Sequence, residues 1–386
     1  MTEPQSRGPV VDPDVVIPSQ GCSNYAFGES IAAHGDELLV GAPYLSYLSR
    51  ANEGIPPPVA CLFRRSATKW AQVEQLSAPD PSRAEGFARA VLLGASFAIV
   101  GAPTNENGDG PTHVYERSVG APFRLRAAVE WVGDAEAFAE FGVALAADEQ
   151  VLLVGARLEF GGSGAVHCFD RRASSTRPIA VLTSGRANEE FGDSVAISGD
   201  LAVIGAPAGD QRETGAAYIY RREAPDRWRQ IVRLPGRRAG EQFGARVAIE
   251  GNRIAVAAPG RFAFGLPPGG GQVRLFELRG DQCDEFACLT DATGFGSALA
   301  LAGNRLAVGQ PTYTAPGGVA QTGRVGLYRI GANDAVSHEA WLERSGSAEY
   351  SRVGGSVALG PDYVAAGAPG LGDEDDGAGF VIVHGW

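Results

Sequence analysis

The feature that most constrains this chain is a short pattern that recurs seven times. Its fourth copy reads FGDSVAISGDLAVIGAP and spans residues 191–207. In every copy an apolar residue stands fourteen positions before a glycine or an alanine. The pairs are Phe27 and Gly41, Phe87 and Gly101, Phe141 and Gly155, Phe191 and Gly205, Phe243 and Ala257, Phe295 and Gly309, and Val353 and Gly367. Because the copies follow one another every 50 to 60 residues, the chain is predicted to be a repeat protein built from equivalent units.

Each copy has the length and the pattern of a four-stranded antiparallel unit. In the fourth copy, SVAIS and LAVIGA read as two strands joined by the turn GD, because glycine accepts the φ angles of tight hairpins. The segments AAYIYRR and RWRQIVRL read as the third and fourth strands, and Pro207 ends the second strand because it lacks an N–H donor. Such a sheet has two apolar faces. It buries both when equivalent sheets pack radially, which is the arrangement of a β-propeller.

The two ends of the chain predict how the ring closes. The seventh copy ends with FVIVHGW, residues 380–386, which supplies a third strand but no fourth. Val15, Val16 and Ile17 precede Phe27 at about the distance at which fourth strands precede the phenylalanine of other copies. We therefore expect residues 15–17 to complete the seventh blade. The predicted fold class is an all-β, seven-bladed β-propeller of four-stranded blades, with residues 1–14 as an N-terminal tail and residues 15–386 as a single domain.

Composition limits the classes of function. Hydrophobic residues make up 44% of the chain, and 53 glycines and 24 prolines suit short strands joined by turns. The formal net charge of −12 argues against a nucleic acid partner. No apolar run is long enough to cross a membrane, so membrane insertion is not expected. The first residues, MTEPQSRGPVVDPDVV, lack the apolar core of a signal peptide, which fits a cytosolic protein or one whose targeting segment has been removed.

The five cysteines point to structural rather than metal-binding roles. An odd number excludes a fully paired disulfide framework, and no CxxC spacing occurs. The segment CDEFAC, from Cys283 to Cys288, is a candidate for a small disulfide loop in an oxidising compartment. Cys168 lies within the apolar segment VHCF, and we expect it to be a buried thiol.

The fourth copy and its continuation, GAAYIYRR and RWRQIVRLPGRRAGEQFG, resemble the FG-GAP repeat family. The best-known members of this family are the propeller heads of integrin α chains, and its bacterial branch has the most similar motifs. The resemblance extends over essentially the whole chain and implies a seven-bladed propeller that acts in adhesion or recognition. It also favours an extracellular or cell-surface location. It does not identify a ligand, because one fold carries many functions.

Integrin-type repeats often carry a calcium loop of the form DxDxDG between FG and GAP. Here that connection is a tight hairpin with at most two carboxylates in every copy, so no calcium is expected there. A second acidic stretch, GLGDEDDGAG, follows the seventh GAP and contains Asp373, Asp375 and Asp376. We interpret it as a solvated acidic loop because the DxDxDG spacing is not met, and a single calcium site remains the alternative. No other cofactor is expected.

The loops between the second and third strands differ most between copies, and they all lie on one face of a propeller. They contain YLSYLSRANEGIPPP, GRFAFGLPPGGG and TYTAPGGVAQT. Aromatic and arginine side chains are typical of surfaces that bind proteins or stack on sugars. Alternatively, these aromatic rings fold back over the ends of the blades. The candidate ligand-binding residues are Tyr44, Tyr47, Arg50, Arg261, Phe262, Phe264 and Tyr313.

No catalytic motif is recognisable. The sequence contains no GxSxG, no HExxH and no phosphate-binding glycine loop. His113 and His167 occupy equivalent positions on third strands, aligned with Tyr218 and Arg274, and we interpret this column as packing rather than as a metal site. We therefore expect a monomeric, non-enzymatic propeller that binds a protein or a glycan through the loops that follow GAP. The alternatives are a polysaccharide lyase or hydrolase, and a structural module of a larger surface protein.

Overall fold

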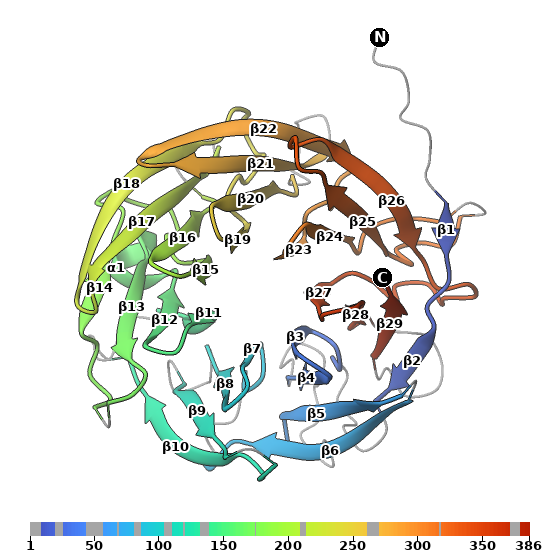
Figure 1. Cartoon of the computed structure of the whole chain (residues 1–386), viewed down its shortest axis with the longest axis horizontal. Helices are drawn as coiled ribbons and strands as arrows, with labels where there is room; N and C mark the ends of the chain where they lie inside the picture. The colour runs from blue at the N-terminus through green and yellow to red at the C-terminus, as the bar shows by residue number, and fades with distance from the viewer. Residues whose placement is uncertain are drawn as a thin grey trace.

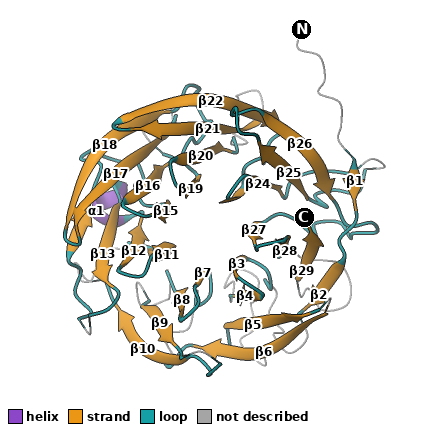
Figure 2. Ribbon diagram, viewed as in Figure 1, coloured by secondary structure: helices purple, strands orange, loops and turns teal. Residues whose placement is uncertain are grey.

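The structure is a computed structural model in which seven antiparallel β-sheets stand in a ring around a central axis (Figure 1). Strands and loops make up nearly all of the ring, as Figure 2 shows. Each sheet is one blade, with its first strand next to the axis and its fourth at the rim. The seven-bladed, all-β fold predicted from the repeats is thus confirmed. The structure describes residues 9–19, 26–43, 57–67, 69–80, 86–103, 110–118, 120–131, 139–173, 175–208, 214–260, 270–315, 318–370 and 379–386.

Four blades come from the first part of the chain, with one helical turn, α1 (Glu159–Gly162), between the second and third strands of blade three. The strands of blades one and two are β3 (Ser30–His34), β4 (Glu37–Ala42), β5 (Val59–Ser66), β6 (Lys69–Ser77), β7 (Ala90–Leu93), β8 (Phe97–Gly101), β9 (Thr112–Glu116) and β10 (Arg124–Val129). Those of blades three and four are β11 (Phe141–Ala147), β12 (Val151–Ala156), β13 (Ala165–Asp170), β14 (Ala180–Leu182), β15 (Ser194–Ser198), β16 (Leu201–Ala206), β17 (Ala216–Ala224) and β18 (Arg227–Pro235).

The other three blades complete the ring. Blade five contains β19 (Arg246–Glu250), β20 (Arg253–Ala258), β21 (Gly271–Arg279) and β22 (Gln282–Asp291). Blade six contains β23 (Ala298–Ala302), β24 (Arg305–Gln310), β25 (Arg324–Ile330) and β26 (Val336–Leu342). Blade seven contains β27 (Ser356–Leu359), β28 (Tyr363–Ala368), β29 (Phe380–Gly385) and β2 (Val15–Pro18).

The N-terminal segment closes the ring. Strand β2 pairs antiparallel with β29, so that Val15 lies opposite Val383 and Ile17 lies opposite Val381. The predicted fourth strand of blade seven is therefore confirmed. A second strand, β1 (Val10–Val11), lies within the segment expected to be a tail and pairs parallel with β26 of blade six. This strand could not be predicted, because two valines between prolines show no strand periodicity. The first residues thus contact two adjacent blades.

Contacts between neighbouring blades explain the repeated motif. All seven recurring apolar residues are fully buried. Gly192, which follows Phe191, has a φ of +95° and donates its N–H to the carbonyl oxygen of Gly205 at 2.9 Å. Gly205 lies against the next blade, because a Cβ added to it would stand 1.9 Å from the carbonyl oxygen of Gly244. The fourteen-residue spacing therefore sets the backbone of one blade against that of the next.

The hydrophobic core lies between the blades rather than within any one of them. Leu201 and Val203 of blade four pack in one cluster with Ile254 and Val256 of blade five. The same kind of cluster joins blade seven to blade one, where Val381 lies among residues of β4 and β5. Burial of apolar surface between sheets is what stabilises a propeller, since a lone blade leaves both faces in water.

Arginine side chains tie the blades together on the face that carries the tight hairpins, which we call the hairpin face. At each of the seven junctions an arginine of one blade contacts a carboxylate or a carbonyl group of its neighbour, and we call this set the arginine belt. Its contacts are Arg65 with Asp362, Arg117 with Glu37, Arg171 with Glu116, Arg222 with Asp148, Arg221 with Asp281, Arg253 with Asp334, and Arg305 with the carbonyl oxygen of Pro361.

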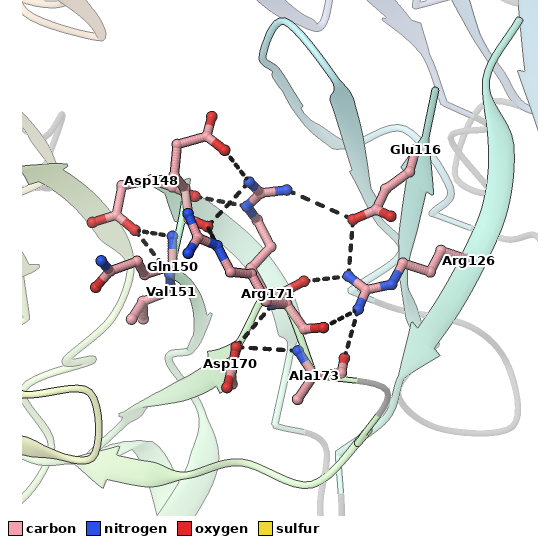
Figure 3. A network of polar contacts seen from close by, with 10 residues as sticks. Glu116, Arg126, Asp148, Gln150, Val151, Asp170, Arg171 and Ala173 are labelled. Atoms are coloured by element: carbon pink, nitrogen blue, oxygen red, sulfur yellow. Dashed lines mark hydrogen bonds and ion pairs between the residues drawn. The ribbon is translucent and has the colours of Figure 1, made fainter. Parts of the chain in front are cut away.

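Figure 3 shows the belt where blades two and three meet. Arg171 donates to the carbonyl oxygen of Asp148 at 2.7 Å and lies 3.7 Å from the carboxylate of Glu116. Arg126 donates to Glu116 at 2.8 Å and also to the carbonyl oxygens of Arg171 and Ala173. These donors and acceptors satisfy one another, so this part of the hairpin face is occupied by contacts within the protein.

The structure contradicts the predicted disulfide loop between Cys283 and Cys288. Cys283 and Cys288 are free thiols on the single strand β22, five residues apart. An extended strand rises about 3.3 Å per residue, so their Cα atoms are roughly 16 Å apart, whereas a disulfide needs less than about 7 Å. The prediction that these two cysteines form a disulfide is therefore wrong. Cys168 is a free, fully buried thiol as expected, and Cys61 on β5 is disulfide-bonded.

Candidate functional site

The face opposite the hairpins, which we call the loop face, carries the loops after GAP and the crossings between blades. Two cavities are lined by residues at this end of the strands. The larger lies on the ring axis and has a volume of about 630 Å³. Its wall is aliphatic, because the first strand of every blade contributes one apolar side chain. These are Ile31, Val91, Leu145, Val195, Val247, Leu299 and Val357.

Charged side chains line the axial cavity where it opens on the loop face. Arg157 donates to Glu140 at 2.6 Å and to Asp193 at 2.8 Å. Burial opposes the charge on Arg157, but these carboxylates outweigh it and raise its pKa above the usual range. Arg89 also lines this opening. It is exposed and has no acidic partner within the described part of the chain. The opening therefore holds both paired charges and a guanidinium group that is available to a ligand.

The second cavity has a volume of about 590 Å³ and lies at the crossings that lead into and out of blade four. We call it the arginine pocket. Its residues come from the crossing before β15, the start of β17 and the end of β18. They are Arg186, Ala187, Glu189, Thr214, Arg233, Pro235, Gly236 and Arg237.

A buried carboxylate orients one of these arginines. Glu189 is 2% exposed and accepts a hydrogen bond from the Tyr218 hydroxyl at 2.5 Å. Arg233 donates through Nε to the same hydroxyl oxygen at 3.0 Å and reaches Glu189 at 3.3 Å. Burial and the adjacent Glu189 raise the pKa of Tyr218, so the phenol keeps the proton that it donates. The position of Arg233 is therefore fixed before any ligand arrives.

An exposed phenylalanine lies in a turn that is bonded to the crossing before blade four. Phe160, in the turn α1 between β12 and β13, is 63% exposed and has a φ of +53°, a conformation that is costly for a residue with a side chain. The turn is rigidly held. Glu159 bonds to His167 at 2.6 Å, and Gly162 accepts the N–H of Glu190 at 2.9 Å. The turn that carries Phe160 is therefore joined to the crossing whose Glu190 lines the axial cavity and whose Glu189 lines the arginine pocket.

Of the ligand-binding residues predicted from the sequence, Tyr313 lies in the described part of the chain. Tyr313 is partly buried, and its ring lies 3.8 Å from the guanidinium carbon of Arg324, whose other face covers Trp341 at 3.6 Å. Tyr313 thus adopts the alternative arrangement, in which the ring folds back over the end of the blade. Outside the described residues lie Tyr44, Tyr47, Arg50, Arg261, Phe262 and Phe264, together with the acidic candidates Asp373, Asp375 and Asp376.

The histidine column packs as predicted. His113 meets the ring of Phe87 edge-on at 5.3 Å, and His167 meets Phe141 in the same way at 5.5 Å. In the next blade Tyr218 takes this place against the recurring phenylalanine. Across the segments that the structure describes, no group of three or more His, Cys, Asp or Glu side chains could hold a metal ion. None of the helices in those segments is long and apolar enough to span a membrane.

Neither the arginine pocket nor Phe160 was predicted from the sequence. The residues predicted to bind a ligand lie in the variable loops, whereas the pocket is built mainly from the crossings between blades. The segment PGRRAG, which places two arginines directly after β18, was the available signal for the pocket. For Phe160 the signal was EFGG, in which an aromatic residue stands between an acidic residue and two glycines.

Comparison with known protein families supports the repeat assignment. The FG-GAP repeat model matches residues 181–220, a segment that runs from the end of blade three through the third strand of blade four. Comparison with curated proteins gives no match. The matched segment contains the fourth copy of the motif, and the other six copies form equivalent blades around the same axis. The matched repeat and the seven-bladed ring together fit an FG-GAP repeat β-propeller.

Proposed function

We propose that this propeller is a non-enzymatic recognition module that binds a partner protein on its loop face, at blades three to five. The observation that carries the proposal is Phe160, a large apolar side chain held in water by a rigid turn in a costly backbone conformation. Backbone strain of this kind concentrates at functional sites. A protein that covered this ring would recover part of the roughly 1.5–3 kcal/mol that full burial of such a side chain provides.

The surroundings of Phe160 fit a protein partner. Protein interfaces draw most of their binding energy from a few aromatic and arginine side chains near their centre. The turn that carries Phe160 is bonded to the crossing that borders the axial cavity and the arginine pocket, and each of these cavities offers arginine donors. Because hydrogen bonds already fix the turn, binding does not require the turn to be ordered first, which would weaken the affinity.

The hairpin face supports the same choice by contrast. Its arginines already bond to neighbouring blades in the arginine belt, so they are not available to a ligand. On the loop face, Arg89 and Arg186 are exposed and have no acidic partner in the part of the chain that the structure covers. The loops after GAP lie on this face too, which agrees with the expectation from the sequence that this face binds the ligand.

The test compares two exposed apolar residues. Phe160→Ala removes the ring, and Leu125→Ala removes a side chain of 44% exposure from the outer strand β10 as the matched control. Immobilised wild-type protein and both variants are incubated with proteins from the source organism, and the retained proteins are identified by mass spectrometry. The dissociation constant of a retained protein is then measured for each variant.

We expect a protein that binds the wild type and Leu125→Ala equally and binds Phe160→Ala at least tenfold more weakly. Equal binding by all three would contradict the proposal. A glycan array with the same variants covers the other ligand class. Glycan binding that depends on Phe160, without such a protein, would assign the surface to sugars instead.

A further inference from the structure

The balance of charge in the arginine pocket indicates the chemistry of its ligand. Arg233 faces the buried Glu189, and Arg237 bonds to Glu285 at 2.8 Å. Arg274 shares Glu285 at 2.7 Å, and Glu241 accepts the backbone N–H of Arg237. Arg186 completes the set and has no acidic partner among the residues that the structure describes. The pocket lining itself carries three arginines, Arg186, Arg233 and Arg237, against one carboxylate, Glu189, so the pocket is positively charged on a protein whose net charge is −12.

We propose that the arginine pocket binds the carboxylate of an aspartate or glutamate side chain that the partner protein inserts beside Phe160. The inference rests on the proposed function, because it names the group of that partner which enters the pocket. The positively charged lining attracts an anion. The buried Glu189 disfavours a group that brings a second negative charge, as a phosphate would, so a singly charged carboxylate fits the pocket better.

The geometry of the donors also favours a carboxylate. Guanidinium groups offer paired N–H donors that match the two oxygens of a carboxylate, and such bonds are stronger than those between neutral groups. Arg233 is oriented in advance by Tyr218, and Thr214 adds a hydroxyl group to the lining. Arg186 and Arg237 lie on the two crossings that border the pocket, so that a carboxylate between them meets donors from both sides.

The backbone around the pocket is held in place. Arg186 donates its N–H to the Ser184 hydroxyl at 3.1 Å. Gly236 donates to the carbonyl oxygen of Gly215 at 2.9 Å, and a Cβ on Gly236 would stand 1.9 Å from the carbonyl oxygen of Thr214. A glycine at this position is thus what lets the crossing to blade five lie so close to the start of β17. The pocket is formed before binding, as small ligand sites usually are.

The experiment uses small probes, so that it does not depend on knowing the partner. N-acetyl-L-aspartate N-methylamide is titrated into protein labelled with ¹⁵N-arginine, and the Nε–H signals are followed by NMR. The asparagine analogue provides a neutral probe of the same shape, and glucuronate provides a carboxylate borne by a sugar. The variant Arg186→Ala/Arg237→Ala removes the two exposed donors and leaves the pair of Arg233 and Glu189 intact. Arg227→Ala is the matched control, because Arg227 is exposed at the opposite end of β18.

We expect the aspartate probe to shift the Arg233 signal with saturation, and the neutral probe to cause no shift. The double variant should bind the aspartate probe at least tenfold more weakly, whereas Arg227→Ala should bind it as the wild type does. Equal binding of the neutral probe, or unchanged binding by the double variant, would overturn the proposal. So would tighter binding of glucuronate than of the aspartate probe.

The outcome separates this inference from the proposed function. Phe160→Ala should leave binding of the aspartate probe unchanged, because the ring is not part of the pocket lining. If the aspartate probe binds but no protein depends on Phe160, the proposed function fails and the pocket stands. If a protein depends on Phe160 but the aspartate probe does not bind, the assignment of the pocket fails alone.

Discussion

Replacing Gly205 by alanine tests the contact that the repeated motif encodes. The new Cβ would stand 1.9 Å from the carbonyl oxygen of Gly244 in the next blade and 2.2 Å from Oγ of Ser194. Atoms of this kind pack at about 3.5 Å, so one group must move by more than an ångström. Overpacking costs about 1–3 kcal/mol. Because the obstacle is the backbone of another sheet, we expect a loss at the upper end of this range, about 3 kcal/mol.

The chain offers its own control at the equivalent position of blade five. Ala257 already carries a methyl group there, facing Gly296. Ala257→Gly should cost about 1 kcal/mol or less through the flexibility of glycine in the unfolded chain. Both variants are compared with the wild type by urea denaturation and by thermal melting. For a chain of 386 residues, a loss of 3 kcal/mol corresponds to a fall of roughly 4 °C in Tm.

The reasoning would be refuted by a Gly205→Ala protein that melts within 1 °C of the wild type. The double variant Ser194→Ala/Gly205→Ala identifies the obstacle. Removing Oγ relieves one close contact and leaves the carbonyl oxygen of Gly244 in place, so stability should recover only in part. Full recovery would show that the serine, and not the neighbouring backbone, limits this position.

Three further predictions follow from the fold. Deleting residues 1–18 removes β2 and β1, and it should lower the Tm strongly and expose the edge of β29, which melting curves and hydrogen exchange will show. Burial opposes ionisation of Glu37, but hydrogen bonds from Arg117 and Arg64 outweigh it and hold its pKa below the usual range. The stability that the ionised Glu37 contributes is complete above its unfolded pKa of about 4.3, and it is lost as the pH falls through its lower pKa in the folded protein. Between pH 5 and 3 the Tm should therefore fall more for the wild type than for Glu37→Gln. Burial raises the pKa of the Cys168 thiol to about 12, so iodoacetamide at pH 8 should label the exposed Cys288 before Cys168. Peptide mass spectrometry of the labelled protein measures this order. Equal labelling of the two thiols in the folded protein would contradict the prediction.

The fold could be predicted because its signals are local and repeated. The spacing from Phe191 to Gly205 recurs in every blade, and the missing fourth strand of blade seven pointed directly to residues 15–17. The arginine belt could not be predicted in the same way. The doublet of Arg221 and Arg222 is visible at the end of a strand, but its acidic partners, Asp281 and Asp148, belong to different blades on either side.

The candidate site was only partly accessible to sequence reasoning. Which face carries the variable loops follows from the strand order, and that face holds both cavities. The exposure of Phe160 depends on a left-handed backbone turn that its neighbours enforce, and no residue pattern predicts this turn. The arginine pocket brings together Arg186 and Arg237, which lie on two successive crossings. Their proximity arises only once blade four stands between its neighbours.

The pairing of β2 with β29 also governs the order in which this protein can mature. During synthesis, Val15 emerges long before its partner Val383. Each blade can pack on the one before it as the chain grows, but the ring has no closed form until β29 leaves the ribosome. Strand β2 must therefore remain unpaired while all the blades between it and β29 are made. A ribosome that stops early releases an open arc with one unmatched strand at the beginning, which a chaperone or a protease can recognise as incomplete.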